Sequence, residues 1–247
     1  MNKILIIPDV HGRPFYKQAV EQCINECEKI IFLGDYVDPY PDEGITRKQA
    51  IETLENIIKL KRDNMDKVVL LIGNHCAHYF INGFPRSTRY DSSNAYHIRD
   101  LYNANLNLFK LAHEETVNNK TFLFTHAGAM RSWVERNQNV IGEPTVENLN
   151  SLMNSNRGIQ ALSDVSTYRS WTGEESGSIL WSDVREKIDK QSTQDNIIPK
   201  QDSIIDQYDF QVFGHTQVKQ PIITDKWACI DTHVPFVIDD ETNIKPL

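Results

Sequence analysis

Five short motifs carry residues that can bind metal ions or transfer protons, and each motif follows an apolar run. They are PDVHG at 8–12, GDYVD at 34–38, GNH at 73–75, THAG at 125–128 and GHT at 214–216. Any one motif alone is typical of an ordinary turn or strand exit. Ligands of open α/β sheets gather at the carboxyl ends of strands, so the five in order are expected to meet at one point.

The motifs supply carboxylates, an amide and imidazoles, which suit divalent ions of hard to borderline character. The six candidate ligands are Asp9, His11, Asp35, Asn74, His126 and His215. The first three would hold one ion and the last three the other, with Asp35 bridging both. One ligand is a neutral amide and adds no charge. The charges of two divalent ions, two carboxylates and a bridging hydroxide therefore sum to roughly +1, which suits a phosphate ester.

The elements that must position these residues begin with four continuously apolar runs. Such runs predict strands buried on both faces, here at 2–8, 29–34, 67–73 and 121–126. Segment 13–27 predicts a helix, and segment 46–62 predicts another that opens with a capping box from Thr46 to Gln49. This βαβαβ order indicates an α/β fold with a largely parallel sheet.

The second half of the chain has a different pattern. Short strands with short connections at 210–215, 227–232 and 236–239 favour a second sheet, mixed or antiparallel. We therefore expect two sheets packed face to face with helices outside, in one domain spanning residues 1–247. Segments near 82–98 and 182–209 lack periodicity, which is typical of lids, binding loops or mobile surface.

Composition narrows the function class. The chain has 247 residues, 40% hydrophobic and 24% charged, with a net charge of −8. That balance argues against a general nucleic-acid or anionic-membrane binder. The apolar run at residues 4–7 is interrupted too early to be a signal peptide, and no apolar run reaches membrane length. We therefore expect a cytoplasmic protein whose four cysteines are reduced.

The ordered motifs resemble those of the calcineurin-like metallophosphoesterases, and most of all the phosphoprotein-phosphatase branch with its bacterial and phage relatives. ILWSDV at 179–184 and CIDT at 229–232 extend the similarity over residues 4 to about 233. The resemblance implies a four-layer fold, with a central β-sandwich of two mixed sheets flanked by helices. It also implies two divalent ions, manganese first and iron or zinc as alternatives, since all three accept this ligand set.

The resemblance implies a mechanism as well. A hydroxide between the ions attacks phosphorus, and His75 protonates the leaving alkoxide while Asp38 orients His75. Such a general acid is typically worth ~10²–10⁴ in rate. Asp183 would support a ligand or His75.

Several positions depart from the family pattern. Gln217 stands where many phosphodiesterase relatives have a second histidine, which favours monoesterase chemistry. Pro39 and Tyr40 replace the Arg-Gly that grips phosphate in the phosphoprotein phosphatases. Another arginine must supply that clamp, with Arg169 as the first candidate. Weaker candidates on the segment after GNH are Arg86, Arg89 and Arg99.

Other departures concern cysteine and histidine. Cys76 occupies a usual Glu or Asp position, which indicates a different local hydrogen bond, and His233 is either an exposed loop residue or reaches the pocket. No motif supports a site role for the remaining histidines, His78, His97 and His113.

The leading hypothesis is a metal-dependent phosphomonoesterase of the serine/threonine protein phosphatase type. Its partner would be a phosphorylated substrate, either a phosphoprotein or a small phosphoester. One alternative is a dinucleoside polyphosphate hydrolase or phosphodiesterase using the same dinuclear site. Another is a non-catalytic scaffold, which the complete ligand set opposes.

Overall fold

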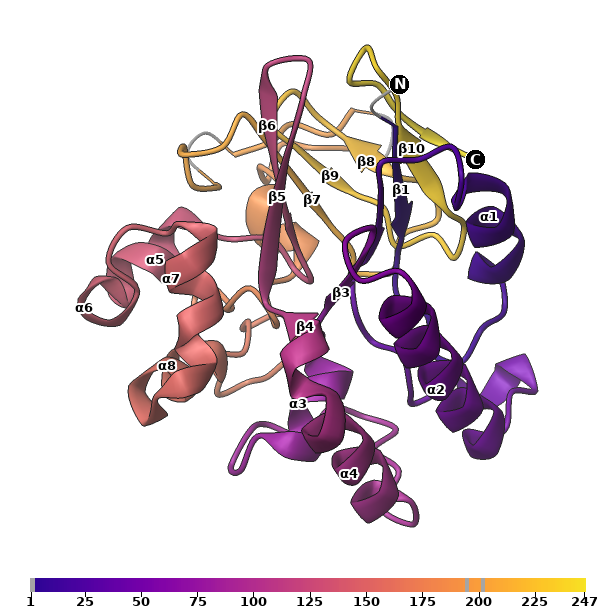
Figure 1. The fold of residues 1–247 in the computed structure, drawn as a ribbon. Helices are drawn as coiled ribbons and strands as arrows, with labels where there is room; N and C mark the ends of the chain where they lie inside the picture. The colour runs from indigo at the N-terminus through magenta and orange to yellow at the C-terminus, as the bar shows by residue number, and fades with distance from the viewer. Residues whose placement is uncertain (1–2, 194–195, 201–202) are drawn as a thin grey trace. The chain divides into compact units, whose positions relative to one another are not determined.

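The computed structural model describes residues 3–193, 196–200 and 203–247 (Figure 1). They form two compact units, one made of the residues up to Lys110 together with His233–Leu247, the other of Leu111–Thr232. Each unit is built on its own mixed sheet, and helices pack against both sheets. The predicted α/β class with two mixed sheets flanked by helices is therefore confirmed.

The first unit has a six-stranded sheet in the order β11-β10-β1-β2-β3-β4. Its parallel strands are β1 (Ile4–Ile7), β2 (Lys29–Phe32), β3 (Val68–Leu71) and β4 (Phe109–Lys110). At the other edge, β10 (Phe236–Ile238) and β11 (Ile244–Pro246) run antiparallel. All residues of β1 and β3 are buried, as their continuously apolar sequences predict.

The helices of the first unit follow its parallel strands. They are α1 (Tyr16–Cys23), α2 (Arg47–Asp63), α3 (Asn74–Phe80) and α4 (Ala95–Asn105), with short 3₁₀ turns η1 (Pro41–Glu43) and η2 (Leu106–Leu108). The predicted capping box of α2 is present: the backbone N–H of Gln49 donates to the Thr46 hydroxyl at 3.2 Å, and the Gln49 side chain accepts from the backbone N–H of Thr46 at 2.9 Å. Ile51, Leu54 and Ile58 lie on the buried face of this helix.

The second unit has a five-stranded sheet in the order β5-β6-β7-β9-β8. Its parallel centre consists of β6 (Lys120–Thr125), β7 (Phe210–Phe213) and β9 (Trp227–Cys229), and its antiparallel edges are β5 (Ala112–Val117) and β8 (Ile222–Ile223). The β5–β6 hairpin, which Figure 1 shows as a long ribbon, is absent from the sequence prediction. Its turn holds Asn118 and Asn119, both at positive φ, and an Asn pair is a signal for such a turn.

Short helices complete the second unit. They are α5 (Arg131–Arg136), α6 (Gln138–Ile141), α7 (Val146–Ser151) and α8 (Asn156–Leu162), with 3₁₀ turns η3 (Leu152–Asn154) and η4 (Val184–Lys187). The aperiodic segment 182–209 does not form a surface lid along its whole length. Val184 and Ile204 from this segment pack in one hydrophobic cluster with Phe213 and Trp227.

No helix in the described ranges combines the length and the apolar character needed to span a membrane. The four cysteines are all buried free thiols.

Candidate functional site

Three of the five motifs meet at one edge of the first unit's sheet. Because β1, β2 and β3 are parallel neighbours, their carboxyl ends lie side by side, and each is followed by polar residues. The residues are Asp9 and His11, then Asp35 and Asp38, then Asn74 and His75, and all six are at most 6% exposed. Ligand atoms of His11, Asp35 and His75 lie within 4.8 Å of one another.

His11 is held in one tautomer. Its Nδ1–H donates to the Val37 carbonyl at 2.7 Å, and a carbonyl can only accept, so Nε2 carries the lone pair. That Nε2 lies 3.8 Å from Asp35 Oδ2. Burial, with the neighbouring His75 and Arg89, lowers the pKa of His11 well below its usual value. A neutral imidazole with a defined lone pair is the form that binds a metal ion.

The acidic donors are buried close enough to repel each other. Burial, and then the charge of Asp9, raise the pKa of Asp35 well above its usual value, although the His75 backbone N–H donates to Asp35 Oδ1 at 2.8 Å. A divalent cation would relieve this cost. The Asn74 amide nitrogen donates to Ser87 Oγ at 2.8 Å, so the amide oxygen is the atom that would serve as a ligand. This donor set fits a divalent metal ion.

Four residues of this site adopt left-handed backbone conformations. The φ angles of His11, Asp35, Asp38 and Arg89 are 45°, 51°, 61° and 67°. Such conformations cost on the order of 1–3 kcal/mol each for a residue with a side chain, and they persist only where surrounding contacts enforce them. They turn the chain sharply after β1 and β2 at His11, Asp35 and Asp38, and in the loop after α3 at Arg89.

The Asp38 carboxylate contacts three polar side chains of α3. Its Oδ2 accepts from His75 Nδ1 at 2.8 Å and lies 2.9 Å from His78 Nε2, a short contact too poorly directed to count as a full hydrogen bond. Its Oδ1 accepts from the Tyr79 hydroxyl. Burial alone would raise the pKa of Asp38, but the contacts from His75 and His78 outweigh it and lower that pKa. The expectation that His78 has no role in the site is therefore wrong, because it contacts Asp38. Its spacing of three residues from His75 on α3, which places both on one helix face, was the sequence signal for this contact.

His75 is neutral in this arrangement. Burial lowers its pKa to about 4, although Asp38 acts in the opposite direction. Because Nδ1–H is donated to Asp38, Nε2 is the nitrogen that faces away from this carboxylate. Nε2 can therefore accept or deliver a proton while Nδ1 stays anchored.

Arg89 enters the site from the aperiodic segment. Its Nε donates to the Asp38 carbonyl at 3.0 Å, and its Nη2 lies 3.4 Å from Nε2 of both His11 and His75. The guanidinium carbon is 3.7 Å from the centre of the Tyr40 ring. The sequence alone favours Arg169 over Arg89 as the arginine that binds phosphate.

The other two arginines after GNH, Arg86 and Arg99, lie over Tyr90 and Tyr96 respectively and line a separate pocket of about 470 Å³.

The second unit brings together the two remaining candidate ligands. His126 follows β6 and His215 follows β7, the neighbouring parallel strand. His126 Nε2 lies 3.1 Å from His215 Nδ1, and Trp181 meets the His215 ring edge-on at 6.1 Å between ring centroids. Two imidazole nitrogens this close form a pair that could bind one cation.

A buried lysine supports the loop after His126. Lys187 is 0% exposed, and its Nζ donates to the Ala127 carbonyl at 3.0 Å and to Ser182 Oγ at 2.5 Å. Burial lowers its pKa to about 8. Gly128 has φ +83°, and a Cβ there would lie 2.8 Å from Lys187 Cε. Only glycine fits this turn without displacing the lysine.

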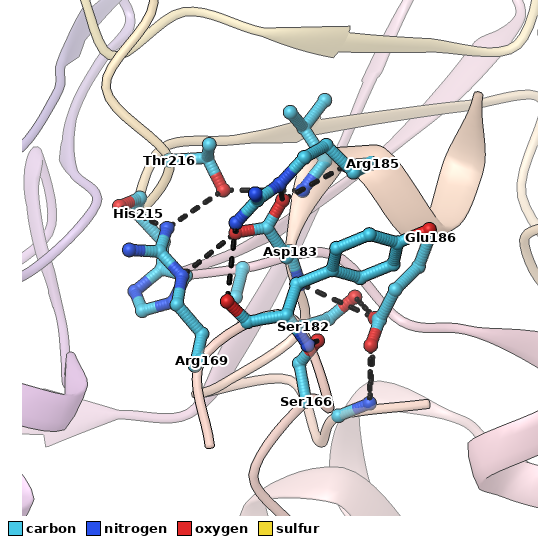
Figure 2. A network of polar contacts seen from close by, with 12 residues as sticks. Ser166, Arg169, Ser182, Asp183, Arg185, Glu186, His215 and Thr216 are labelled. Carbon is cyan, nitrogen blue, oxygen red and sulfur yellow. Dashed lines mark hydrogen bonds and ion pairs between the residues drawn. The ribbon is translucent and has the colours of Figure 1, made fainter. Parts of the chain in front are cut away.

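Asp183 and Arg169 belong to one polar network in the second unit (Figure 2). Asp183 Oδ2 lies 2.7 Å from Arg169 Nε, and Oδ1 accepts from Arg185 Nε at 2.7 Å. Burial alone would raise the pKa of Asp183, but the two arginines outweigh it and lower that pKa. Arg169 Nη2 donates to Thr216 Oγ1 at 3.2 Å and lies 3.5 Å from the His215 carbonyl. Asp183 thus positions arginines beside the His215 loop.

The remaining positions have separate surroundings. Burial raises the pKa of the Cys76 thiol to about 12, and its Sγ lies 4.0 Å from Asp35 Oδ1, the different local bond expected there. His233 lines a pocket of about 500 Å³ in the first unit that includes the Arg13–Glu43 ion pair.

His97 and His113 lie near Glu55 and Glu115, at 3.8 Å and 2.8 Å, away from the strand-end residues.

The fold has known relatives among solved structures. The chain is similar to a protein serine/threonine phosphatase from Saccharomyces cerevisiae with similarity to human phosphatase PP5 (14% identity, TM-score 0.56, 98% of this chain and 78% of that one). With lower TM-scores, the chain is also similar to a hypothetical protein from Pyrococcus horikoshii OT3 (10% identity, TM-score 0.48, 100% of this chain and 87% of that one). A third similar structure is an archaeal phosphodiesterase (13% identity, TM-score 0.38, 99% of this chain and 98% of that one).

No curated protein matches the chain. The calcineurin-like phosphoesterase profile matches residues 2–219, nearly the whole length, and the yeast phosphatase shares the fold. The sequence resemblance is thereby confirmed, and with it a hydrolase class that acts on phosphoesters through bound metal. The chain belongs to the calcineurin-like phosphoesterase family.

Proposed function

We propose that this protein is a phosphomonoesterase of the serine/threonine protein phosphatase type. The observation that carries the proposal is the Asp38–His75 pair, which lies at the same sheet edge as the buried donors His11 and Asp35. A proton carrier fixed beside metal-binding donors is what cleavage of an unactivated phosphoester requires, because an alkoxide leaving group must be protonated.

We assign the metal ligands by the order of the motifs. Asp9, His11 and Asp35 would hold one divalent ion, and Asp35 would be shared with a second ion held by the three remaining candidates, Asn74, His126 and His215. This assignment treats residues 1–247 as one catalytic domain. Manganese is the proposed metal, and iron or zinc would accept the same donors. The bound ions would supply a nucleophilic water at neutral pH and offset the charge of the phosphate.

The residues of the chain then have distinct tasks. Asp38 anchors Nδ1–H of His75, so the proton for the leaving oxygen is carried at Nε2. Burial keeps the free imidazole neutral. A phosphate dianion beside it adds negative charge, which favours the protonated imidazolium needed for donation. Asp38 stabilises that cation through its short bond.

The choice of a monoester rests on Gln217, which directly follows the last motif, together with the fold shared with the yeast protein phosphatase. A second candidate is cleavage of dinucleoside polyphosphates or phosphodiesters. It is favoured by one observation, the replacement of the usual Arg-Gly by Pro39 and Tyr40.

Turnover of a paired substrate set by manganese-loaded protein tests the proposal. The set contains a phosphothreonine peptide, para-nitrophenyl phosphate, its bis ester and a diadenosine polyphosphate, each with and without chelator. We expect chelator-sensitive release of phosphate from the peptide. His75→Asn should lower peptide turnover by ~10²–10⁴ and affect the activated aryl ester less.

His97→Asn, at an exposed histidine, is the matched control. Cleavage of only the dinucleotide or the bis ester would refute the monoesterase proposal. Full activity of His75→Asn on the peptide would refute the role of His75. Inactivity on all four substrates by protein that binds no metal would support a scaffold.

A further inference from the structure

We propose that Arg89, stacked on Tyr40, is the guanidinium that binds the substrate phosphate. This inference rests on the proposed function and names the residue that replaces the clamp missing after Asp38. Sequence position favours Arg169 for this role, and the contacts of the two arginines reverse that order.

The position of Arg89 is defined by contacts on three sides. Its Nε donates to the Asp38 carbonyl at 3.0 Å, and its guanidinium carbon lies 3.7 Å from the centre of the Tyr40 ring. Its Nη2 is equidistant, at 3.4 Å, from Nε2 of His11 and Nε2 of His75. One of these imidazoles is a proposed metal ligand and the other the proposed proton donor, so the guanidinium faces the place where both would act on a phosphoryl group.

The charge of Arg89 is available for an anion. Its hydrogen-bond partners are a carbonyl, a hydroxyl and two imidazoles, and it pairs with no carboxylate among the described residues. Arg13 lies on the same Tyr40 ring at 5.0 Å, but its guanidinium is bound to Glu43 at 2.7 Å. Arg169 is likewise committed to Asp183 at 2.7 Å.

The substituted motif explains why the arginine can come from a distant segment. Pro39 has a restricted φ, and the extended Tyr40 that follows presents its ring under Arg89. Stacking on an aromatic face reduces the freedom of a long side chain and adds a cation–π attraction. A planar fork in this position can bind two oxygens of one phosphate, which favours a dianionic monoester over a diester.

The experiment compares Arg89→Ala and Arg89→Lys with wild-type protein, and uses Arg86→Ala as the control. Arg86 lies three residues earlier and lies over Tyr90 instead, so its removal changes the net charge equally. The first readout is the Kd of inorganic phosphate for manganese-loaded protein, measured by titration calorimetry. Metal content is measured on every variant, and kcat and KM are measured on para-nitrophenyl phosphate and its bis ester.

We expect Arg89→Ala to weaken phosphate binding by about 10- to 100-fold with unchanged metal content, as loss of charge-assisted hydrogen bonds predicts. Arg89→Lys should lose less, and Arg86→Ala should match wild type. Tyr40→Ala should raise KM for the monoester more than it lowers kcat, and Tyr40→Phe, which keeps the ring, should restore KM. These effects would identify Tyr40 as the residue that positions Arg89.

Equal phosphate affinity in wild type, Arg89→Ala and Arg89→Lys would overturn the inference, whatever the substrate proves to be. If wild-type protein cleaves no monoester but Arg89→Ala still loses phosphate affinity, the proposed function fails and the inference stands. If Arg86→Ala weakens binding as much as Arg89→Ala, the effect is one of net charge, and the inference is wrong.

Discussion

Lys187 allows a stability prediction whose size follows from the structure. Its ammonium group is fully buried beneath the loop that carries His126, bound to the Ala127 carbonyl and to Ser182. Burial lowers the pKa of this group from 10.5 to about 8, while Glu186 acts in the opposite direction. A shift of that size corresponds to about 3 kcal/mol of lost stability while the lysine is charged.

The sign of the pH dependence follows from proton binding. Below about pH 8 the folded and unfolded states both hold the proton, and the cost is constant. Between about pH 8 and 10.5 the folded state releases the proton first, so the unfolded state binds more protons and stability rises with pH. Above that window both states are neutral and the cost is gone.

The assay is urea unfolding of wild type and Lys187→Met from pH 7 to 10.5. The free energy of unfolding of wild type, minus that of the variant, should rise by about 3 kcal/mol across this range. Lys190→Met, at an exposed lysine nearby, should show no such rise against wild type. A difference that stays flat with pH for Lys187→Met would refute the reasoning that burial destabilises the charged form.

Three further changes have defined outcomes. Asp35→Ala should abolish binding of both ions and all activity, because it removes the proposed bridge; retention of two manganese ions by elemental analysis would contradict this. Thr46→Ala should lower the free energy of unfolding by about 1 kcal/mol through loss of the α2 cap, as denaturant titration would measure. Gly128→Ala should cost ~1–3 kcal/mol, because alanine is strained at φ +83° and its Cβ meets the Lys187 side chain; a melting temperature equal to that of wild type would be inconsistent with this packing.

The buried strands, the helix α2 and three clustered motifs were predictable from local pattern. An apolar run such as 67–73 can only be satisfied in the interior of a sheet, and parallel strands bring their carboxyl ends to one edge whatever the rest of the fold does. For that reason the amino-acid sequence suffices to place Asp9, Asp35 and Asn74 together. Local pattern does not predict the β5–β6 hairpin because its alternating stretch is short, although its Asn pair signals the turn.

The identity of the supporting residues was decided only by tertiary structure. Arg89 and Lys187 have no periodicity or motif that sets them apart, since each acts through a partner distant in sequence. Arg89 reaches Asp38 across 51 positions, and Lys187 reaches Ala127 across 60. Local sequence determines which backbone a segment prefers. Which charged side chain is buried against which partner depends on how loops with strained φ values return to the sheet, and that is settled only when the whole chain packs.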